Sequence, residues 1–482
     1  MSTTRVLVLD VGTSGVRAAV TGADGAVLRE VAREVLPATP ADGLVEFDPA
    51  EMAAAVLAVA HEVLDGETVD GVGITNQRAS AIVWDRATGE PIGPGLGWQD
   101  LRTIGECFAA REHGLRLAPN QTATKVQWLL DQADPDRRRD VLVGTVDTWV
   151  AAVISGGSLH VTDATNAGVT GLANIGITAW NPSALDALRI PASAMARIVD
   201  SAGPLGAATA LPGAPPVVAI LGDQQASLAG QACVEVGSAK ITFGTGGMLD
   251  QNLGTAAPHT DHRHAHGSFP IAAWRVDGTV TWGLESIMLA AGTNVQWLRD
   301  DLGLLEHAGQ SHDVAQQCAS TDGVVYVPAL MGLGTPAWDY GARSALYGLT
   351  RGTSRAHIVR AVLEGVAQRG ADLVEAAEAD SGIPIPALRI DGGMSDNPTF
   401  VQALADAAQK PVEVSPVREA TTLGAALFAL LALGEFGSVA DLGRTWAPRV
   451  RVEPGAPLDR ERWRSAVERS RRWIPELSGI DF

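Results

Sequence analysis

The sequence predicts an α/β protein built from two related α/β domains. Near the N-terminus, three strands joined by tight glycine turns lead into a helix and a further strand, an order typical of a mixed sheet. A strand that ends in a turn of small residues returns after residue 237. The chain of 482 residues, 46% of them hydrophobic, is long enough for roughly two to four domains with large cores. We expect domains of residues 1–232 and 233–482.

The first domain is expected to begin with an antiparallel meander, because β-branched residues and leucine alternate with glycine turns. Asp48 and Pro49 predict a helix that reaches about Leu64, with Asp48 as its N-cap and Pro49 in the first helical position. The expected strands cover residues 5–9, 16–20, 26–35, 69–75 and 81–85.

The second part of the chain predicts a hairpin around Asp277 and Gly278, followed by a long helix from about Ser286 to Leu298. A charged amphipathic helix over residues 459–472 is expected to close the fold. The expected strands cover residues 217–221, 237–243, 271–276 and 280–283.

Composition excludes several classes of function. The formal charge is −19, without a basic stripe, so nucleic acid and anionic membranes are poor partners. The three cysteines are far apart and form neither a disulfide framework nor a zinc motif. Residues 1–10 lack the features of a signal peptide, and we expect a cytoplasmic protein.

Two turns of small residues are candidate phosphate sites. In residues 10–17, Asp10 closes a strand beside a glycine turn, whose amides could cradle phosphate oxygens while the carboxylate holds Mg²⁺. Residues 243–247 repeat this design around Thr245. A plain hairpin would explain either turn alone. Together, one in each domain, they could hold a triphosphate across a cleft.

Two further segments add candidate nucleotide and catalytic groups. Paired glycines, Gly392 and Gly393, precede a helix that begins near Pro398, with Asp396 or Asn397 as its cap, a setting that suits phosphates. Asp223 follows a buried strand and opens a helix. It could be an ordinary N-cap, or it could accept the proton of a substrate hydroxyl that attacks a phosphate.

An arginine and a tryptophan are candidates for holding the acceptor. Arg78 ends a strand, and its guanidinium can orient hydroxyls, while Trp98 offers an apolar wall for a carbon skeleton. Surface packing would explain each of them alone. The histidine-rich run His259–His266 invites a metal site, but a surface loop is the favoured interpretation.

In this order, these segments resemble the FGGY family of carbohydrate kinases, and its glycerol kinase branch most closely. The resemblance extends from Val6 to about Gly434 and is carried by Gly73–Arg78 with Trp98–Thr103, by Gly222–Gln231 and by Ser344–Glu364. It implies two ribonuclease-H-like domains of the actin and hexokinase type that close on an interdomain cleft. It also implies ATP and Mg²⁺, and a homodimer or homotetramer.

The resemblance implies a role for each matching residue. Asp10 is the carboxylate on the Mg²⁺ side, and Asp223 is the general base. The acceptor would be lined by Arg78, Trp98, Asp223 and Gln224. The nucleotide and its phosphates would contact Thr13, Ser14, Arg17, Thr245, Gly292, Gln296, Gly393 and Asn397.

Three positions depart from the glycerol kinase pattern. Ala79 replaces a glutamate that holds glycerol hydroxyls, Asn120 replaces a tyrosine, and Met248 replaces a phenylalanine. The loss of bulk and of a carboxylate should weaken glycerol binding by about 1–3 kcal/mol. We therefore expect a larger acceptor, such as a tetritol, pentitol or ketopentose, with glycerol as the alternative.

Two other interpretations remain at this point. Xylulokinases share the style of the opening turn but carry a Met-His pair where this chain has Asn76–Arg78. A non-enzymatic ATP-binding switch of the actin or chaperone type would share both turns, but it would not need Asp223, Arg78 and Trp98 together. ATP turnover that depends on an added polyol would distinguish the kinase from the switch.

Overall fold

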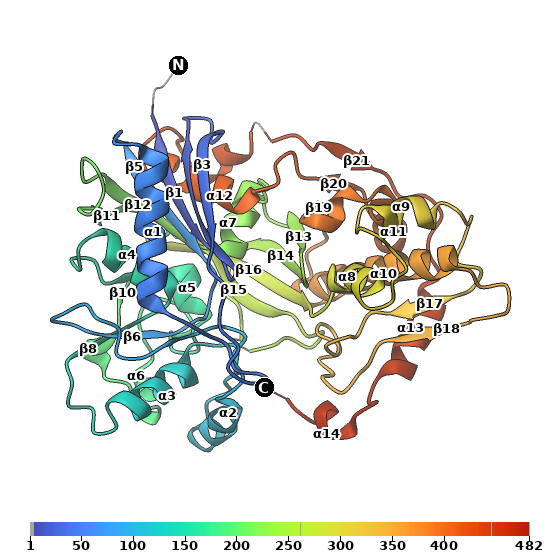
Figure 1. The fold of residues 1–482 in the computed structure, drawn as a ribbon, viewed down its shortest axis with the longest axis horizontal. Coiled ribbons are helices and arrows are strands. Elements are labelled where there is room, and N and C mark those ends of the chain that lie inside the picture. Colours follow the sequence, from blue (N-terminus) through green and yellow to red (C-terminus); the bar gives the residue numbers. More distant parts are fainter. Residues whose placement is uncertain (1–3, 261, 445, 482) are drawn as a thin grey trace.

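The computed structural model describes residues 4–260, 262–444 and 446–481, and it has two large sheets (Figure 1). The first sheet has six strands in the order β11-β12-β5-β1-β2-β3. β1 pairs antiparallel with β2 and parallel with β5, which confirms the expected mixed sheet. Its strands are β1 (Val6–Val11), β2 (Gly15–Thr21), β3 (Val27–Glu34), β5 (Gly71–Asn76), β11 (Ala202–Ala207) and β12 (Pro216–Gly222).

The second sheet repeats the pairing of the first. β13 pairs antiparallel with β14 through a short turn and parallel with β19, as β1 pairs with β2 and β5. Two related α/β domains are thereby confirmed. The seven strands, in order across the sheet, are β15 (Phe269–Val276), β16 (Thr279–Met288), β14 (Gly247–Gly254), β13 (Ala239–Phe243), β19 (Leu388–Asp391), β20 (Val412–Val414) and β21 (Val450–Val452).

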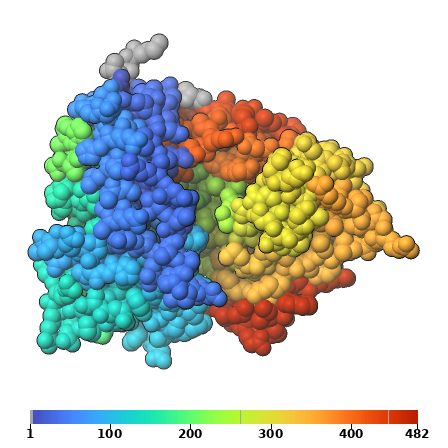
Figure 2. All heavy atoms as spheres, in the orientation of Figure 1, coloured from blue at the N-terminus to red at the C-terminus, as the bar shows by residue number. Residues whose placement is uncertain are grey.

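Helices pack on the outer face of each sheet and between the two sheets. α1 (Pro49–Leu64) and α4 (Val146–Ile154) pack on one face of the first sheet. α7 (Asp223–Gly230) and α12 (Ala420–Ala432) lie between the two sheets in one buried cluster with Val6 and Val8. α10 (Arg355–Ser381) and α11 (Pro398–Ala408) cover the outer face of the second sheet. Figure 2 shows a hollow in the surface between the blue N-terminal half and the yellow and orange C-terminal half.

The expected helix over 286–298 was wrong at its start. β16 continues to Met288, and helix α8 (Thr293–Asp300) begins five residues later. β16 lies between β14 and β15. The alternation of polar and apolar residues in this strand runs from Thr279 to Glu285 and breaks at Ser286, and the residues from Trp282 to Ser286 are buried without interruption.

One predicted helix start and one predicted helix are confirmed. The Asp48 side chain accepts hydrogen bonds from the backbone N–H groups of Ala50 at 2.8 Å and Glu51 at 3.4 Å, so it is the N-cap of α1. The charged C-terminal segment forms α13 (Arg460–Ser470), capped by Asp459. Within the described ranges, no helix is long and apolar enough to cross a membrane.

The remaining elements are short. Small two-stranded sheets are β4 (Glu46–Phe47) with β7 (Gly95–Leu96), β6 (Ile82–Asp85) with β8 (Val141–Gly144), β9 (Val161–Asp163) with β10 (Arg197–Val199), and β17 (Val325–Val327) with β18 (Ala345–Tyr347). The other helices are α2 (Ile104–Ala110), α3 (Ala123–Ala133), α5 (Ala164–Gly168), α6 (Pro182–Ala187), α9 (Gln310–Ala315) and α14 (Pro475–Ser478).

Candidate active site

Asp10 lies at the end of β1, directly opposite Arg17 on β2. Its Oδ2 atom is 3.4 Å from the Thr422 hydroxyl on α12, and Arg17 forms an ion pair with Glu419 just before that helix. Burial raises the pKa of Asp10 to about 7, against the effect of Arg17, and the nearby Asp223 carboxylate raises it further. A cation placed here would relieve this repulsion between carboxylates.

A backbone hydrogen bond closes the turn between β1 and β2, and this turn contacts one of the predicted acceptor residues. The Gly12 N–H donates to the Gly15 carbonyl at 2.9 Å, which leaves Thr13 and Ser14 at the tip. The indole N–H of Trp98 donates to the Thr13 hydroxyl at 3.1 Å. Ser14 is exposed, whereas Trp98 is partly buried. The predicted phosphate turn and the predicted apolar wall are therefore in direct contact.

Asp223, Gln224 and Arg78 come together where β5 and β12 end. These strands are parallel neighbours, so the residues after them emerge at the same edge. Arg78 Nε is 3.4 Å from Asp223 Oδ1, and a Cβ atom on Gly222 would lie 2.7 Å from Arg78 Cδ, so the glycine leaves room for this side chain. Asp223 is the first residue of α7, whose N-cap is Gly222, so the N-cap alternative is wrong.

The electrostatics around Asp223 suit a proton acceptor. Burial raises the pKa of the Asp223 carboxyl, while the charges of Arg78 and Lys240 oppose that rise. Its carboxyl nevertheless keeps 30% of its side-chain surface accessible, so a small molecule can reach it. A carboxylate with a raised pKa at an accessible edge is a candidate general base.

On the second sheet, Thr245 and Gly292 meet in one compact loop pair. The Ala291 N–H donates to the Thr245 carbonyl at 2.8 Å, and the Gly292 N–H donates to the Gly244 carbonyl at 2.9 Å. A Cβ atom on Gly292 would lie 2.6 Å from the Gly244 oxygen, so only glycine allows this approach. Gln296 is exposed in the first part of α8.

Gly393 and Asn397 follow β19, the parallel neighbour of β13. Gly392 has a φ of 84° and packs against the Phe243 backbone, which joins this loop to the turn that holds Thr245. Asn397 is the N-cap of α11: its Oδ1 accepts from the Phe400 N–H at 3.1 Å. Its Nδ2 donates to Ser311 Oγ at 2.9 Å. Both polar ends of Asn397 thus have protein partners, and its nucleotide role stays a prediction.

The three departing positions occupy different surroundings. Ala79 is 8% exposed and has a φ of 61°, in the left-handed region. Asn120 is exposed in the turn before α3, and Met248 is partly buried on β14, opposite Thr242 and Ile287.

Lys125, which the sequence reasoning missed, connects the Asn120 turn to Trp98. Its buried Nζ donates to the backbone carbonyls of Pro119 at 2.7 Å, Gln121 at 3.1 Å and Trp98 at 3.4 Å. Burial lowers the pKa of Lys125 to about 7, against the charge of Asp100. Lys125 lies in the first turn of an amphipathic helix, and nothing in the sequence around it distinguishes it from a surface lysine.

Lys240, Asp250 and Glu285 were also missed, although each is a charged residue inside a mostly buried strand. Lys240 Nζ lies 2.7 Å from Asp250 Oδ2, and both side chains are fully buried. Arg78 Nη2 donates to Glu285 Oε2 at 2.7 Å. Buried charges of this kind are retained in pairs, and the charges within the strand pattern were the available signal.

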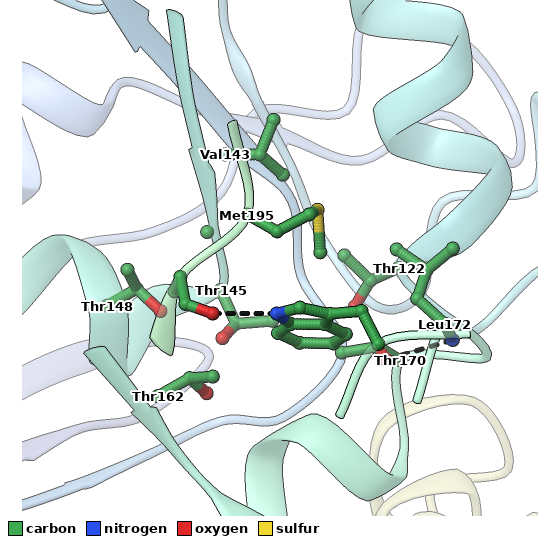
Figure 3. Close-up of a pocket in the computed structure, with 11 residues that line it drawn as sticks. Thr122, Val143, Thr145, Thr148, Thr162, Thr170, Leu172 and Met195 are labelled. Atoms are coloured by element: carbon green, nitrogen blue, oxygen red, sulfur yellow. Dashed lines mark hydrogen bonds between the residues drawn. The ribbon is translucent and has the colours of Figure 1, made fainter. Parts of the chain in front are cut away.

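A small pocket in the first domain lies apart from the predicted residues (Figure 3). Its volume is about 10 Å³, enough for one water molecule at most. The Trp180 indole N–H donates to the Ala196 carbonyl at 2.6 Å, and the Leu172 N–H donates to the Thr170 hydroxyl at 3.1 Å. None of the predicted acceptor residues lines it, so it is not the acceptor pocket.

The histidine-rich run 259–266 contacts an acidic side chain. His266 donates its backbone N–H to Asp380 at 2.8 Å, and its Nδ1 lies 2.9 Å from the same carboxylate oxygen. Asp261 lies outside the described residues. In the part of the chain that the structure describes, no group of three or more His, Cys, Asp or Glu side chains could hold a metal ion.

Comparisons with known proteins match nearly the whole chain. The models of the N-terminal and C-terminal domains of the FGGY family of carbohydrate kinases match residues 5–230 and 239–433. A glycerol kinase from Aromatoleum aromaticum is 40% identical, over 97% of this chain and 99% of its own. One from Deinococcus radiodurans is 39% identical, over 97% and 98%.

Solved structures share the fold. Plasmodium falciparum glycerol kinase with ADP has a TM-score of 0.88 and 28% identity, covering 97% of this chain and 98% of its own. A xylulose kinase from Lactobacillus acidophilus has a TM-score of 0.83 and 19% identity, covering 97% and 96%.

Proposed function

The chain belongs to the FGGY family of carbohydrate kinases, and we propose that it phosphorylates a hydroxyl of an acceptor larger than glycerol, such as a tetritol, pentitol or ketopentose. The chain is an ATP-dependent carbohydrate or polyol kinase, and its family and relatives decide against a non-enzymatic switch. The choice of acceptor, the site residues and the use of Mg²⁺ belong to the proposal.

The observation that carries the proposal is the cluster of Asp223, Arg78 and Gln224 at the ends of β5 and β12. Arg78 Nη1 is a buried donor without a hydrogen-bond partner among the described residues, so it can serve a hydroxyl of the acceptor. Asp223, 3.4 Å from Arg78 Nε, then accepts the proton as that hydroxyl oxygen attacks the γ-phosphate of ATP. Trp98 forms the wall against the carbon skeleton.

The residues around Asp10 fit a magnesium ion. Mg²⁺ prefers oxygen ligands and usually takes one or two carboxylates together with phosphate oxygens and water. Asp10 offers a buried carboxylate whose pKa is raised mainly by burial, and the charge of Arg17 opposes that rise only in part. Asp10 would hold the ion, which would offset negative charge on the phosphates. Thr13, Ser14 and Arg17 lie on the same turn and strand, and Thr245, Gly292, Gln296, Gly393 and Asn397 would contact the nucleotide.

The enlarged acceptor rests on Ala79, Asn120 and Met248. Ala79 follows Arg78 directly and carries no carboxylate, so the hydroxyl that a glutamate would hold has no acceptor from this position. A ligand with more hydroxyls can reach other donors, such as the Nε2 amide of Gln224. Glycerol is the second candidate, favoured by the identity of 40% to proteins named glycerol kinase.

The test is an ADP-release assay across glycerol, tetritols, pentitols, ketopentoses and hexonates, with a reaction lacking acceptor as the baseline. We expect kcat/KM for a four- or five-carbon acceptor to exceed that for glycerol at least tenfold. A preference for glycerol over all others contradicts the enlarged pocket. ADP release that no acceptor stimulates contradicts the proposed acceptor class altogether. Light scattering of the purified protein tests the predicted homodimer or homotetramer.

A further inference from the structure

Three charged side chains of the second sheet lie side by side beneath the acceptor residues. Lys240 on β13 stands opposite Asp250 on β14, and Asp250 stands opposite Glu285 on β16. In paired antiparallel strands, residues in register project from the same face. Lys240 and Asp250 are fully buried, and Glu285 keeps only 3% of its side-chain surface. We name these residues the buried triad.

Each end of the buried triad holds one of the predicted acceptor residues. Lys240 Nζ donates to Gln224 Oε1 at 2.7 Å, in addition to its ion pair with Asp250. Glu285 Oε2 accepts from Arg78 Nη2 at 2.7 Å. Gln224 and Arg78 follow strands of the first sheet, whereas the triad belongs to the second sheet. The triad therefore connects the two domains at the acceptor residues.

These contacts fix the direction of hydrogen bonding. A lysine ammonium only donates, so the Gln224 carboxamide must present its oxygen to Lys240, and its Nε2 donors face away. Arg78 has Nη2 committed to Glu285 and Nε near Asp223, which leaves Nη1 as its unpartnered donor. Gln224 and Arg78 thus each present N–H groups that can donate to an oxygen atom of the substrate.

The cluster contains more acidic than basic groups. Asp223, Asp250 and Glu285 face two cations, Arg78 and Lys240, so full ionisation would leave one negative charge in excess. Burial raises the pKa of Glu285 to about 7, and the neighbouring Asp250 adds to the rise, against the effect of Arg78. Removing Lys240 alone would leave Asp250 buried and unpaired.

We propose that Lys240, Asp250 and Glu285 are positioning residues, which orient Gln224 and Arg78 from the second domain so that both donate to the acceptor. This inference rests on the proposed function, because it takes Gln224 and Arg78 as acceptor ligands. Gln224 and Arg78 belong to the first domain, but the second domain determines how they are oriented. The acceptor site is then complete only when the second sheet lies against the first.

The test compares a double variant, Lys240→Met with Asp250→Leu, with the unchanged protein. The double change removes both charges of the ion pair together, so the net charge of the cluster stays the same. We expect KM for the best acceptor to rise 10- to 100-fold, KM for ATP to change less than threefold, and kcat to change less than KM. A crystal structure should show the Gln224 carboxamide turned from its original orientation.

Two further variants separate positioning from stability. Asp250→Asn keeps the shape and an oxygen acceptor for Lys240, so its acceptor KM should lie between those of the unchanged protein and the double variant. It also serves if the double variant fails to fold. Lys410→Met with Glu378→Gln removes another ion pair of the second domain, at 2.8 Å and away from the acceptor residues, and should leave the acceptor KM unchanged.

The possible outcomes are distinct. An unchanged acceptor KM in a folded double variant, or in Asp250→Asn if the double variant does not fold, overturns the inference. So does an equal rise in both KM values. If the unchanged protein shows no acceptor-dependent ADP release, the proposed function fails. The crystal structures then decide the orientation claim alone: a Gln224 carboxamide that keeps its orientation without Lys240 refutes it.

Discussion

Arg78 Nε lies 3.4 Å from Asp223 Oδ1, although the two residues belong to distant parts of the chain. The contact follows from topology, because β5 and β12 are parallel neighbours in which Asn76 stands opposite Gly222. The carboxyl ends of parallel strands share one edge of the sheet, where α/β proteins bind ligands. A cation and a carboxylate with a raised pKa are thereby held beside each other.

Asp223→Asn should abolish most turnover. The amide cannot accept a proton, and general base catalysis contributes about 10²- to 10⁴-fold to rates. We expect kcat to fall by about that factor while the dissociation constant for ATP, measured by calorimetry, stays within threefold. Asp186→Asn, at an exposed position on α6, is the matched control. Full activity of Asp223→Asn would reject the role of this residue.

Ala79→Glu should move the preference toward glycerol. The new carboxylate would lie next to Arg78 and could accept a glycerol hydroxyl, worth about 1–3 kcal/mol for a hydrogen bond to a charged group. We expect KM for glycerol to fall about 5- to 100-fold in the ADP-release assay. KM for the larger acceptor should rise, because the glutamate fills space.

A glycine at the same position is the control for that variant. Ala79 has a φ of 61°, so Ala79→Gly relieves backbone strain without adding a carboxylate. Its KM for glycerol should not fall. If Ala79→Gly lowers that KM as much as Ala79→Glu does, backbone freedom and not the carboxylate is responsible.

Local signals in the sequence predicted the first domain and the turns well. Asp48 followed by Pro49 marks a helix start through chemistry confined to neighbouring residues, and the structure has that cap. The end of the strand over 279–288 resembles a helix in the sequence, because its alternation of polar and apolar residues breaks at Ser286. The position of α12 against Val6 and Val8 of the first sheet is a long-range contact that no local pattern reveals.

The candidate site likewise contains residues that the sequence indicates and residues that it does not. Asp10, Asp223 and Arg78 were accessible to sequence reasoning because polar residues that end apolar strands are conspicuous. Lys125 carried no such signal, and Lys240 carried only its charge within a strand, because their partners are three backbone carbonyls in one case and a buried aspartate on another strand in the other. Their surroundings are determined by tertiary packing, which spacing does not encode.

Asp10→Asn should stabilise the protein at neutral and higher pH. Folding raises the pKa of Asp10 from 3.8 to about 7, so between these values the folded state binds more protons than the unfolded state. Stability from this group is full below pH 4 and is lost as the pH rises toward 7. The asparagine removes this loss. The variant should gain up to roughly 4 kcal/mol over the unchanged protein at pH 8, since one pKa unit corresponds to about 1.4 kcal/mol.

Urea unfolding of both proteins at pH 5 and pH 8 checks this expectation. The difference in the free energy of unfolding should be larger at pH 8 than at pH 5. A constant difference would show that Asp10 titrates normally in the folded protein. The same variant should lose activity, because Asp10 is the proposed carboxylate for Mg²⁺, and stability gained at the expense of activity is typical of functional sites.

Helices α7 and α12 are in direct contact. A Cβ atom on Gly424 would overlap the Ala226 carbonyl, and one on Gly230 would overlap the Ala420 carbonyl, so these helices touch through glycine on both sides. α7 begins with Asp223, and Thr422 of α12 contacts Asp10. Gly424→Ala should therefore separate two helices that hold the proposed catalytic carboxylates.

We expect Gly424→Ala to lower the free energy of unfolding by about 1–3 kcal/mol, as overpacking does, and to lower kcat/KM at temperatures where the protein stays folded. Gly105→Ala on α2 is the control: its Cβ meets nothing within 4 Å, so better helix propensity should stabilise the protein by about 0.5–1 kcal/mol. If Gly424→Ala lowers neither the free energy of unfolding nor kcat/KM, the prediction is wrong. The two helices could then separate without moving Asp223 or Asp10.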